Sequence, residues 1–206
     1  MRLMLDKSAK EISDIRTESG LTIYQLRTPL TQYRPDITYG LDNGAFTLFN
    51  SRTFTKMAIA AVNDSRCLWI AVPDYPYCAY STLGLFHHWK SIVPKKRAFV
   101  LQNGIYRHKM AIPWEEIVCV FVGGDDDFKE SREAVEIAIE ARERGKWVHV
   151  GRVNTVRRLD FWEPYADTFD GSGIARFSHM RDPIIQYLQQ IENTTQRGLN
   201  DYGENE

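Results

Sequence analysis

The amino-acid sequence predicts an α/β protein with a parallel sheet, and three observations support this fold class. Short apolar runs of strand character alternate with segments of helical periodicity along the 206 residues. The strand-like runs are apolar throughout, which is typical of strands buried on both faces. The connections are short, so each helix is expected to cross over between parallel strands. A closed barrel and an open sheet both fit this pattern.

Seven runs are predicted to form strands. They are residues 21–26, 37–41, 67–72, 98–101, 117–122, 147–150 and 166–169. The run at 117–122 (IVCVFV) has the strongest strand character, because β-branched and aromatic residues fit a pleated, buried surface. The runs at 67–72 (CLWIAV) and 147–150 (WVHV) share this composition.

Helices are predicted between these strands from apolar spacing and from capping residues. The predicted helices are residues 53–62, 81–92, 128–144, 154–162 and 183–191, with a short helical turn at 113–116. Ser81 and Asn154 are suitable N-caps for two of them. In the helix at 128–144, alanine and isoleucine recur at spacings of three and four, and Gly145 ends it.

The composition indicates a globular chain with a sizeable core. Its residues are 43% hydrophobic and 12% aromatic, which argues against disorder. No apolar run is long enough to span a membrane, and the N-terminus lacks the apolar segment of a signal peptide. Three cysteines without CxxC spacing favour a reducing compartment, so we expect a cytoplasmic protein. Residues 1–193 are expected to form one domain, and residues 194–206 a polar, flexible tail.

Polar residues and glycines follow six of the predicted strands. These strand ends are Asp42-Asn43-Gly44, Pro73-Asp74-Tyr75, Gln102-Asn103-Gly104, Gly123-Gly124-Asp125, Gly151-Arg152 and Asp170-Gly171. The carboxyl ends of parallel strands lie on one face of an α/β fold, where active sites form. The sequence therefore predicts a functional site on that face.

Each of these features also has a simpler interpretation. An aspartate after a strand is often a helix cap, and Asn43-Gly44 is a strong hairpin signal. The element predicted after Asn43-Gly44 is a helix and not a partner strand, which favours a turn at the rim of a pocket. His149 is expected to be a core histidine with satisfied hydrogen bonds, and His87-His88 lacks the spacing of a metal site.

Several of the strand ends resemble motifs of the tRNA-guanine transglycosylases. Residues 42–46 (DNGAF) resemble the Asp-Ser-Gly-Gly-Phe motif of that family, and residues 101–104 (LQNG) resemble its Val-Gln-Gly segment. Val122-Gly123-Gly124 resembles its Gly-Gly-Leu strand end. Residues 166–170 (ADTFD), followed by Arg176, resemble its Asp-Met-Phe-Asp segment with a following arginine, which holds the nucleophile.

The order of these motifs is that of the family, and the matches span residues 37–177. Family members are TIM barrels that exchange guanine for a 7-deazapurine by cleaving and remaking an N-glycosidic bond. The resemblance therefore implies a compact (β/α)8 TIM barrel, with allowance for a degenerate N-terminal portion. It also implies a glycosyltransferase that acts through a covalent glycosyl-enzyme intermediate.

The resemblance assigns roles to individual residues. Asp170 matches the nucleophile, and Asp42 matches a second carboxylate that handles protons. Asp74 would accept hydrogen bonds from N1–H and the exocyclic amine of guanine, and Gln102 would bond its carbonyl oxygen. The implied base-binding set is Asp74, Gln102, Gly123, Gly124, Phe46, Tyr75 and Asn103, with the Gly124 amide as a donor and Phe46 or Tyr75 stacking on the ring.

The expected partner and cofactors follow from two features in which this chain differs from the family. The zinc site of three cysteines and a histidine found in the tRNA enzymes has no counterpart after Asp170, so no metal or other cofactor is expected. The chain is also shorter than those enzymes, which favours a DNA-modifying enzyme of the phage kind, located in host cytoplasm. Net charge is −1, so nucleic acid would be bound by a local patch, with Arg152, Arg157, Arg158 and Arg176 as candidates.

Three alternatives stay open at this point. A pocket of the same kind could serve an N-glycosidase or nucleoside hydrolase that uses water as the acceptor. It could also serve a barrel that binds a purine or nucleotide without catalysis. If the order of the motifs is coincidental, the chain is a barrel enzyme of another class.

Overall fold

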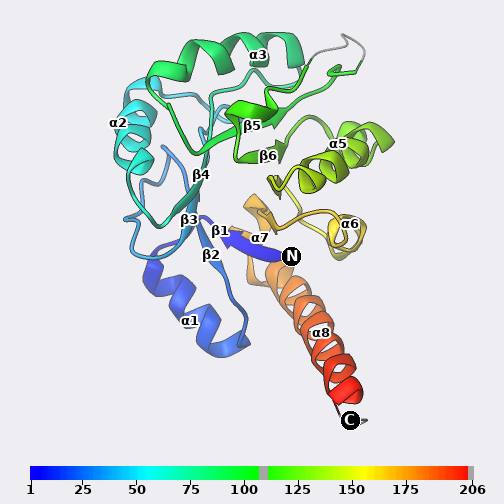
Figure 1. The fold of residues 1–206 in the computed structure, drawn as a ribbon. Coiled ribbons are helices and arrows are strands. Elements are labelled where there is room, and N and C mark those ends of the chain that lie inside the picture. Colours follow the sequence, from blue (N-terminus) through cyan, green and yellow to red (C-terminus); the bar gives the residue numbers. More distant parts are fainter. Residues whose placement is uncertain (107–110, 204–206) are drawn as a thin grey trace.

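The computed structural model describes the backbone of residues 1–106 and 111–203, and side chains as far as Thr194. Within these residues eight parallel strands pair in the order β1-β2-β3-β4-β5-β6-β7-β8, and β8 pairs with β1 to close a barrel (Figure 1). The predicted (β/α)8 TIM barrel is therefore confirmed.

The strands are β1 (Arg2–Leu5), β2 (Tyr24–Arg27), β3 (Tyr39–Leu41), β4 (Cys67–Ala71), β5 (Arg97–Leu101), β6 (Cys119–Val122), β7 (Trp147–Val150) and β8 (Thr168–Phe169). The α-helices are α1 (Ala9–Ser19), α2 (Ser51–Val62), α3 (Ala79–His88), α4 (Asp126–Lys129), α5 (Arg132–Glu143), α6 (Val156–Trp162), α7 (Ser172–Arg176) and α8 (Ser178–Gly203). Two short 3-10 helices, η1 (Trp89–Ser91) and η2 (Trp114–Glu116), complete the described set.

The N-terminal portion contains one complete unit and one reduced unit. The sequence patterns did not predict β1 and α1, yet α1 is regular, and a capping box between Ser8 and Glu11 begins it. The structure describes every residue of the connection between β2 and β3, residues 28–38, and none of them is helical. The expected degenerate N-terminal portion is thus limited to this connection.

All five predicted helices have different bounds in the structure, and both predicted N-caps are wrong. α3 begins after Cys78 and not at Ser81, and α6 is capped by Thr155, whose side chain accepts from the Arg158 amide, and not by Asn154.

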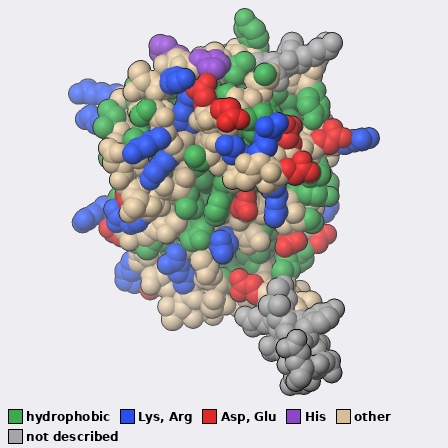
Figure 2. All heavy atoms as spheres, in the orientation of Figure 1, with side chains coloured by type: hydrophobic (Ala, Val, Ile, Leu, Met, Phe, Trp, Pro, Cys, Tyr) green, Lys and Arg blue, Asp and Glu red, His purple; other side chains and the backbone are tan. Residues whose placement is uncertain are grey.

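The bounds of two helices differ the most. The segment predicted as one helix over 128–144 is divided into α4 and α5, because the Ser131 side chain caps a new helix at the Ala134 amide. The last helix, predicted over 183–191, is α8, which extends beyond that range in both directions. None of the helices in the described part of the chain combines the length and the hydrophobicity that a bilayer-spanning helix needs. On the face shown in Figure 2, acidic and basic side chains are interspersed over the surface.

The barrel interior is filled by one set of alternating strand residues. Because the strands are parallel and paired in register, residues that face each other across the ladder share a side of the sheet. The inward-facing apolar cluster is Met4, Leu26, Trp69, Ala71, Ala98, Val100, Cys119 and Phe121. The helices lie around the outside of the barrel (Figure 1). A second, larger apolar cluster joins outward-facing strand residues to the buried faces of these helices.

Trp69 is the largest fully buried side chain of the interior cluster, and Gly40 on the neighbouring strand makes room for it. A Cβ atom at Gly40 would lie 2.4 Å from the Trp69 ring. The indole packs edge-on against Phe121, with ring centroids 5.6 Å apart, and its centroid lies 4.6 Å from that of His149. A glycine in the middle of β3 is therefore a requirement of barrel packing.

We predict that Gly40→Ala lowers the free energy of unfolding by about 1–3 kcal/mol, because Trp69 must shift in a closed interior. Urea denaturation measures the change. Gly84→Ala in α3 is the control, because no atom lies within 4 Å of its added Cβ. Helix propensity should make that control neutral or stabilising by up to about 1 kcal/mol. Equal stabilities of the Gly40→Ala and wild-type proteins would contradict the packing account.

Candidate active site

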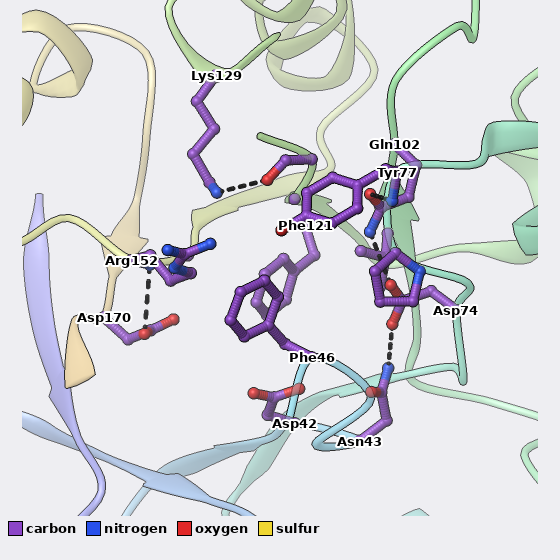
Figure 3. Close-up of a pocket in the computed structure, with 15 residues that line it drawn as sticks. Asp42, Asn43, Phe46, Asp74, Tyr77, Gln102, Phe121, Lys129, Arg152 and Asp170 are labelled. Carbon is purple, nitrogen blue, oxygen red and sulfur yellow. Dashed lines mark hydrogen bonds between the residues drawn. The ribbon is translucent and has the colours of Figure 1, made fainter. Parts of the chain in front are cut away.

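A pocket of about 80 Å³ opens at the carboxyl ends of the strands (Figure 3). Its lining comes from the segments that follow β3 to β8. The lining residues are Asp42, Asn43, Phe46, Asp74, Pro76, Tyr77, Val100, Gln102, Phe121, Gly123, Gly124, Lys129, Gly151, Arg152 and Asp170. The predicted convergence of polar strand ends is therefore observed on one face of the barrel.

Asp42 occupies the pocket rim directly after β3. β3 and β4 pair in parallel, so the Asn43-Gly44 segment is a turn leaving a parallel strand, not a hairpin. The Gly44 amide donates to Asp42 Oδ1 at 3.2 Å. Burial, and secondarily the charge of Asp170, raises the pKa of Asp42 to about 7. Asp42 is therefore a carboxyl group that can hold or release a proton near neutral pH.

Asp170 follows β8 and is the end point of a hydrogen-bond chain inside the barrel. Trp147 Nε1 donates to Thr168 Oγ1 at 3.0 Å, and Thr168 Oγ1 lies 2.9 Å from His149 Nδ1. His149 Nε2 lies 3.0 Å from Asp170 Oδ2. The indole nitrogen can only donate, so the Thr168 hydroxyl proton is free to go to Nδ1. This network assigns the imidazole proton to Nε2, which donates to Asp170.

His149 is fully buried between Trp69 and Phe121, with ring centroids 4.6 and 4.5 Å away. The prediction of a core histidine with satisfied hydrogen bonds is confirmed. Sequence reasoning did not predict its contact with Asp170. His149 lies on β7, and Asp170 directly follows β8. Because the strand register pairs His149 with Thr168, the next inward-facing residue after Thr168, which is Asp170, reaches the imidazole.

Asp74 is held by amide donors on the opposite side of the pocket. It accepts from Asn43 Nδ2 and from Gln102 Nε2, both at 2.7 Å. The Tyr77 amide donates to Gln102 Oε1 at 2.7 Å, which fixes the orientation of the Gln102 amide. Burial raises the pKa of Asp74, and the two amide bonds oppose that shift. The result is a rigid carboxylate whose remaining acceptor capacity faces the cavity.

Two glycines keep the pocket floor open. A Cβ atom on Gly123 would lie 2.8 Å from the Leu101 carbonyl oxygen and 2.9 Å from Gln102 Nε2. A Cβ atom on Gly151 would lie 2.7 Å from the Phe121 ring. Both positions follow strands β6 and β7 in the inward-facing alternation, so any side chain there would fill the space above the barrel core.

Of the predicted aromatic and amide residues, Phe46 and Gln102 line the pocket, whereas Tyr75 and Asn103 do not. Phe46 lines the pocket, its ring 6.3 Å from that of Tyr77. Tyr75 is 59% exposed and does not line the pocket, and Tyr77 takes the position predicted for it. Asn103 also lies outside the lining, where it exchanges hydrogen bonds with Asp125 at 2.8 and 3.1 Å. Its observed role is to join the segments that follow β5 and β6.

Of the four arginines predicted to contact nucleic acid, Arg152 alone lines this pocket. Arg157 and Arg158 pair with Glu130, and Arg158 also pairs with Asp126. Their guanidinium groups are already neutralised by acidic partners. Arg176 is exposed on α7 and is not part of the lining.

Sequence reasoning missed two ionisable residues at the strand ends. Lys129 is 1% exposed and lines the pocket, although it was read as part of a helical pattern. Asp6 follows β1 and accepts from Thr31 Oγ1 at 2.5 Å. Burial raises the pKa of Asp6, with a smaller contribution from the charge of Asp170. Asp6 could be found only by identifying β1, whose four residues carry a weak strand signal.

Family models, curated proteins and solved structures offer no match to this chain. The site is therefore interpreted from its own geometry and from the motif resemblance. Among the residues that the structure describes, no group of three or more His, Cys, Asp or Glu side chains is placed to hold a metal ion.

We predict a pH-dependent stability difference between the wild type and Asp42→Asn. The folded pKa of about 7 lies above the ordinary value of 3.8, so folding favours the protonated carboxyl group. This contribution is fully present below about pH 4 and is lost as pH rises through 7. The variant keeps an oxygen for the Gly44 amide but cannot ionise.

Relative to Asp42→Asn, the wild type should therefore lose up to about 4 kcal/mol of unfolding free energy between pH 4 and pH 8. Urea denaturation at four pH values across this range measures it. A wild-type-to-variant difference that is constant with pH would contradict the raised pKa.

Proposed function

We propose that this protein is a nucleic-acid base transglycosylase that exchanges guanine for a 7-deazaguanine base. The observation that carries the proposal is the pair of carboxyl groups, Asp42 and Asp170, lining one pocket in different environments. Asp42 is partly buried and has a raised pKa, whereas Asp170 is buried and accepts a hydrogen bond from His149. Two carboxyl groups with distinct environments suit the distinct roles of proton carrier and nucleophile.

In the proposed reaction an Asp170 carboxylate oxygen attacks C1′ of the target nucleotide. The bond from C1′ to the guanine nitrogen breaks, its electron pair leaves with the base, and a glycosyl ester forms on Asp170. A nitrogen of the entering base then attacks C1′ and releases the carboxylate. The N-glycosidic bond is broken once and remade once, so no net oxidation occurs.

Asp42 would carry the proton that this exchange requires. The departing purine leaves as an anion unless it is protonated, and the entering base must lose a proton. A carboxyl group with a pKa of about 7 can give a proton to one and take it from the other at neutral pH. Asp42 lines the same pocket as Asp170, whose charge contributes to its raised pKa, and this is consistent with the role.

The amide-held side of the pocket would bind the base. The Asp74 carboxylate is oriented by Asn43 and Gln102 and would accept from the N1–H and exocyclic amine of guanine. The second Gln102 N–H and the Gly124 amide would bond the guanine carbonyl oxygen. Phe46 and Tyr77 supply aromatic faces at the mouth. The resemblance favours DNA over tRNA as the polymer, and a duplex target would have to be flipped out of its stack.

His149 would act as a positioning residue for the nucleophile. Its Nε2–H bond to Asp170 Oδ2 orients the carboxylate and stabilises the charge that returns when the ester breaks. The imidazole is itself fixed by Thr168 and by two aromatic neighbours, so its N–H direction is set by the barrel core.

We predict that Asp170→Asn abolishes base exchange while the protein stays folded. Incubation with guanine-containing oligonucleotides, followed by a denaturing gel, should trap a covalent protein–DNA adduct only in the wild type. Asp127→Asn is the matched control, since Asp127 is exposed and outside the pocket. Adduct formation or exchange by Asp170→Asn would refute its role. Release of free guanine without an entering base would indicate a hydrolase, and binding without an adduct would indicate a binding protein.

We also predict that His149→Gln retains far more exchange activity than His149→Leu, because glutamine can present an N–H near the position of Nε2. Loss of the donor in His149→Leu should lower kcat about 10- to 100-fold with little change in KM, as expected for one charge-assisted hydrogen bond. Single-turnover kinetics and thermal denaturation of both variants give the comparison. Equal activity of the two variants would assign His149 to packing alone.

A further inference from the structure

Two basic side chains, Lys129 and Arg152, line the pocket without an acidic partner. Lys129 Nζ donates to the Gly124 carbonyl oxygen at 2.9 Å, and the Arg152 guanidinium lies 4.2 Å from the centre of the Phe46 ring. Neither forms an ion pair with a carboxylate among the residues that the structure describes, whereas nearby Arg157 and Arg158 do. The pocket thus keeps two cationic groups available.

The environment of Lys129 is unusual for a structural lysine. The residue is 1% exposed, and its ammonium group has three donors but one protein acceptor. A buried ammonium group is unfavourable unless an anion or several acceptors surround it. A neutral side chain with one N–H or O–H group could donate to the Gly124 carbonyl oxygen equally well. That hydrogen bond therefore does not explain why a charged side chain is buried here. The two other N–H groups of Lys129 have no acceptor among the described residues. Because Lys129 lines the pocket, a bound ligand could accept from them.

The two cations lie on one side of the cavity. Figure 3 shows Lys129 and Arg152 on the side of Asp170, and Asp74, Asn43 and Gln102 on the opposite side. The second side offers hydrogen-bonding groups suited to a neutral ring. A nucleotide whose base contacts Asp74 and Gln102 and whose C1′ atom lies at Asp170 would place its phosphate group on the side of the two cations.

We infer that Lys129 and Arg152 form a subsite that binds the phosphate of the reacting nucleotide. The inference rests on the proposed function and names the residues that would hold the phosphate of its substrate. Lysine and arginine together bind phosphate oxygens by charge and by directed N–H groups. The phosphate is that of the reacting nucleotide and comes either from a mononucleotide or from a polymer backbone.

The neighbouring carboxylate fits this assignment. Ester formation on Asp170 removes its negative charge during the covalent stage. The phosphate then faces two cations and a neutral ester, so its binding is strongest while the base is exchanged. In Arg152, the stacking of the guanidinium on Phe46 leaves its edge N–H groups free for an anion.

The test measures how strongly the protein prefers phosphorylated ligands. Calorimetry compares deoxyguanosine, its 5′-phosphate, its 3′-phosphate and the trinucleotide d(TGT) with the full chain. We expect at least tenfold tighter binding of a phosphorylated ligand than of deoxyguanosine. In Lys129→Met and in Arg152→Asn the preference should fall below twofold. Asparagine is chosen because it tolerates the left-handed backbone at Arg152, where φ is 63°.

Matched controls are Lys56→Met and Arg132→Gln, which alter exposed residues on α2 and α5 and should keep the full preference. A stronger preference for d(TGT) than for both monophosphates identifies a polymer substrate, and the reverse identifies a mononucleotide. A wild-type preference below twofold, or a full preference in folded Lys129→Met and Arg152→Asn, would overturn the subsite. Thermal denaturation verifies that each variant is folded.

The effect of inorganic phosphate on the Tm tests the phosphate-binding subsite independently of the proposed base exchange. Phosphate alone should raise the Tm of the wild type and have a smaller effect on both subsite variants. If no guanine compound binds but this phosphate effect is present, the subsite stands and base exchange fails. If the covalent protein–DNA adduct forms but the phosphorylated ligands bind no better than deoxyguanosine, the subsite fails and base exchange stands.

Discussion

The site depends on the alternation of side chains inside a closed parallel barrel. Along β5 to β8 the inward positions are Val100, Phe121, His149 and Thr168, which are paired across the ladder. The next inward-facing position after each of these comes directly after the end of its strand. Those positions are Gln102, Gly123, Gly151 and Asp170, and all four line the pocket. The same register that packs the core therefore fixes the site, and a slip of one residue in a strand would turn its lining residue outward.

The core and the site are also connected by hydrogen bonds. The chain from Trp147 through Thr168 and His149 reaches Asp170 without using solvent. Trp147 is at the start of β7, so the chain runs the length of the barrel interior. A polar network of this kind is favourable only when every member is satisfied. Both His149 nitrogens have partners, and its ring is enclosed by Trp69 and Phe121. The rigidity of the nucleophile side follows from this enclosure.

The sequence was informative where one signal determined the structure. Apolar runs predicted β2 to β8, because strands buried on both faces need uniform hydrophobicity. The Asp42, Asp74, Gln102 and Asp170 positions followed from their places after those strands. Contacts across the barrel were not predictable, since His149 meets Asp170 through strand register and not through sequence spacing. Lys129 was missed because helical periodicity cannot show that a short helix turns its side chain inward. Tyr75 and Tyr77 differ only in turn geometry, which the sequence pattern does not determine.

Two of the four non-glycine residues found with positive φ in the described chain line the same pocket. Tyr77 and Arg152 have φ values of 65° and 63°, which side chains other than glycine rarely adopt. Such conformations raise the free energy by about 1–3 kcal/mol each unless the surroundings compensate. Here the Tyr77 amide is held by Gln102, and the Val153 amide, next to Arg152, donates to the Asp170 carbonyl oxygen at 2.6 Å. Glycine would relieve the strain at either position. The side chains present instead place an aromatic ring and a cation in the cavity lining, so the strain is best explained by what these two side chains contact there.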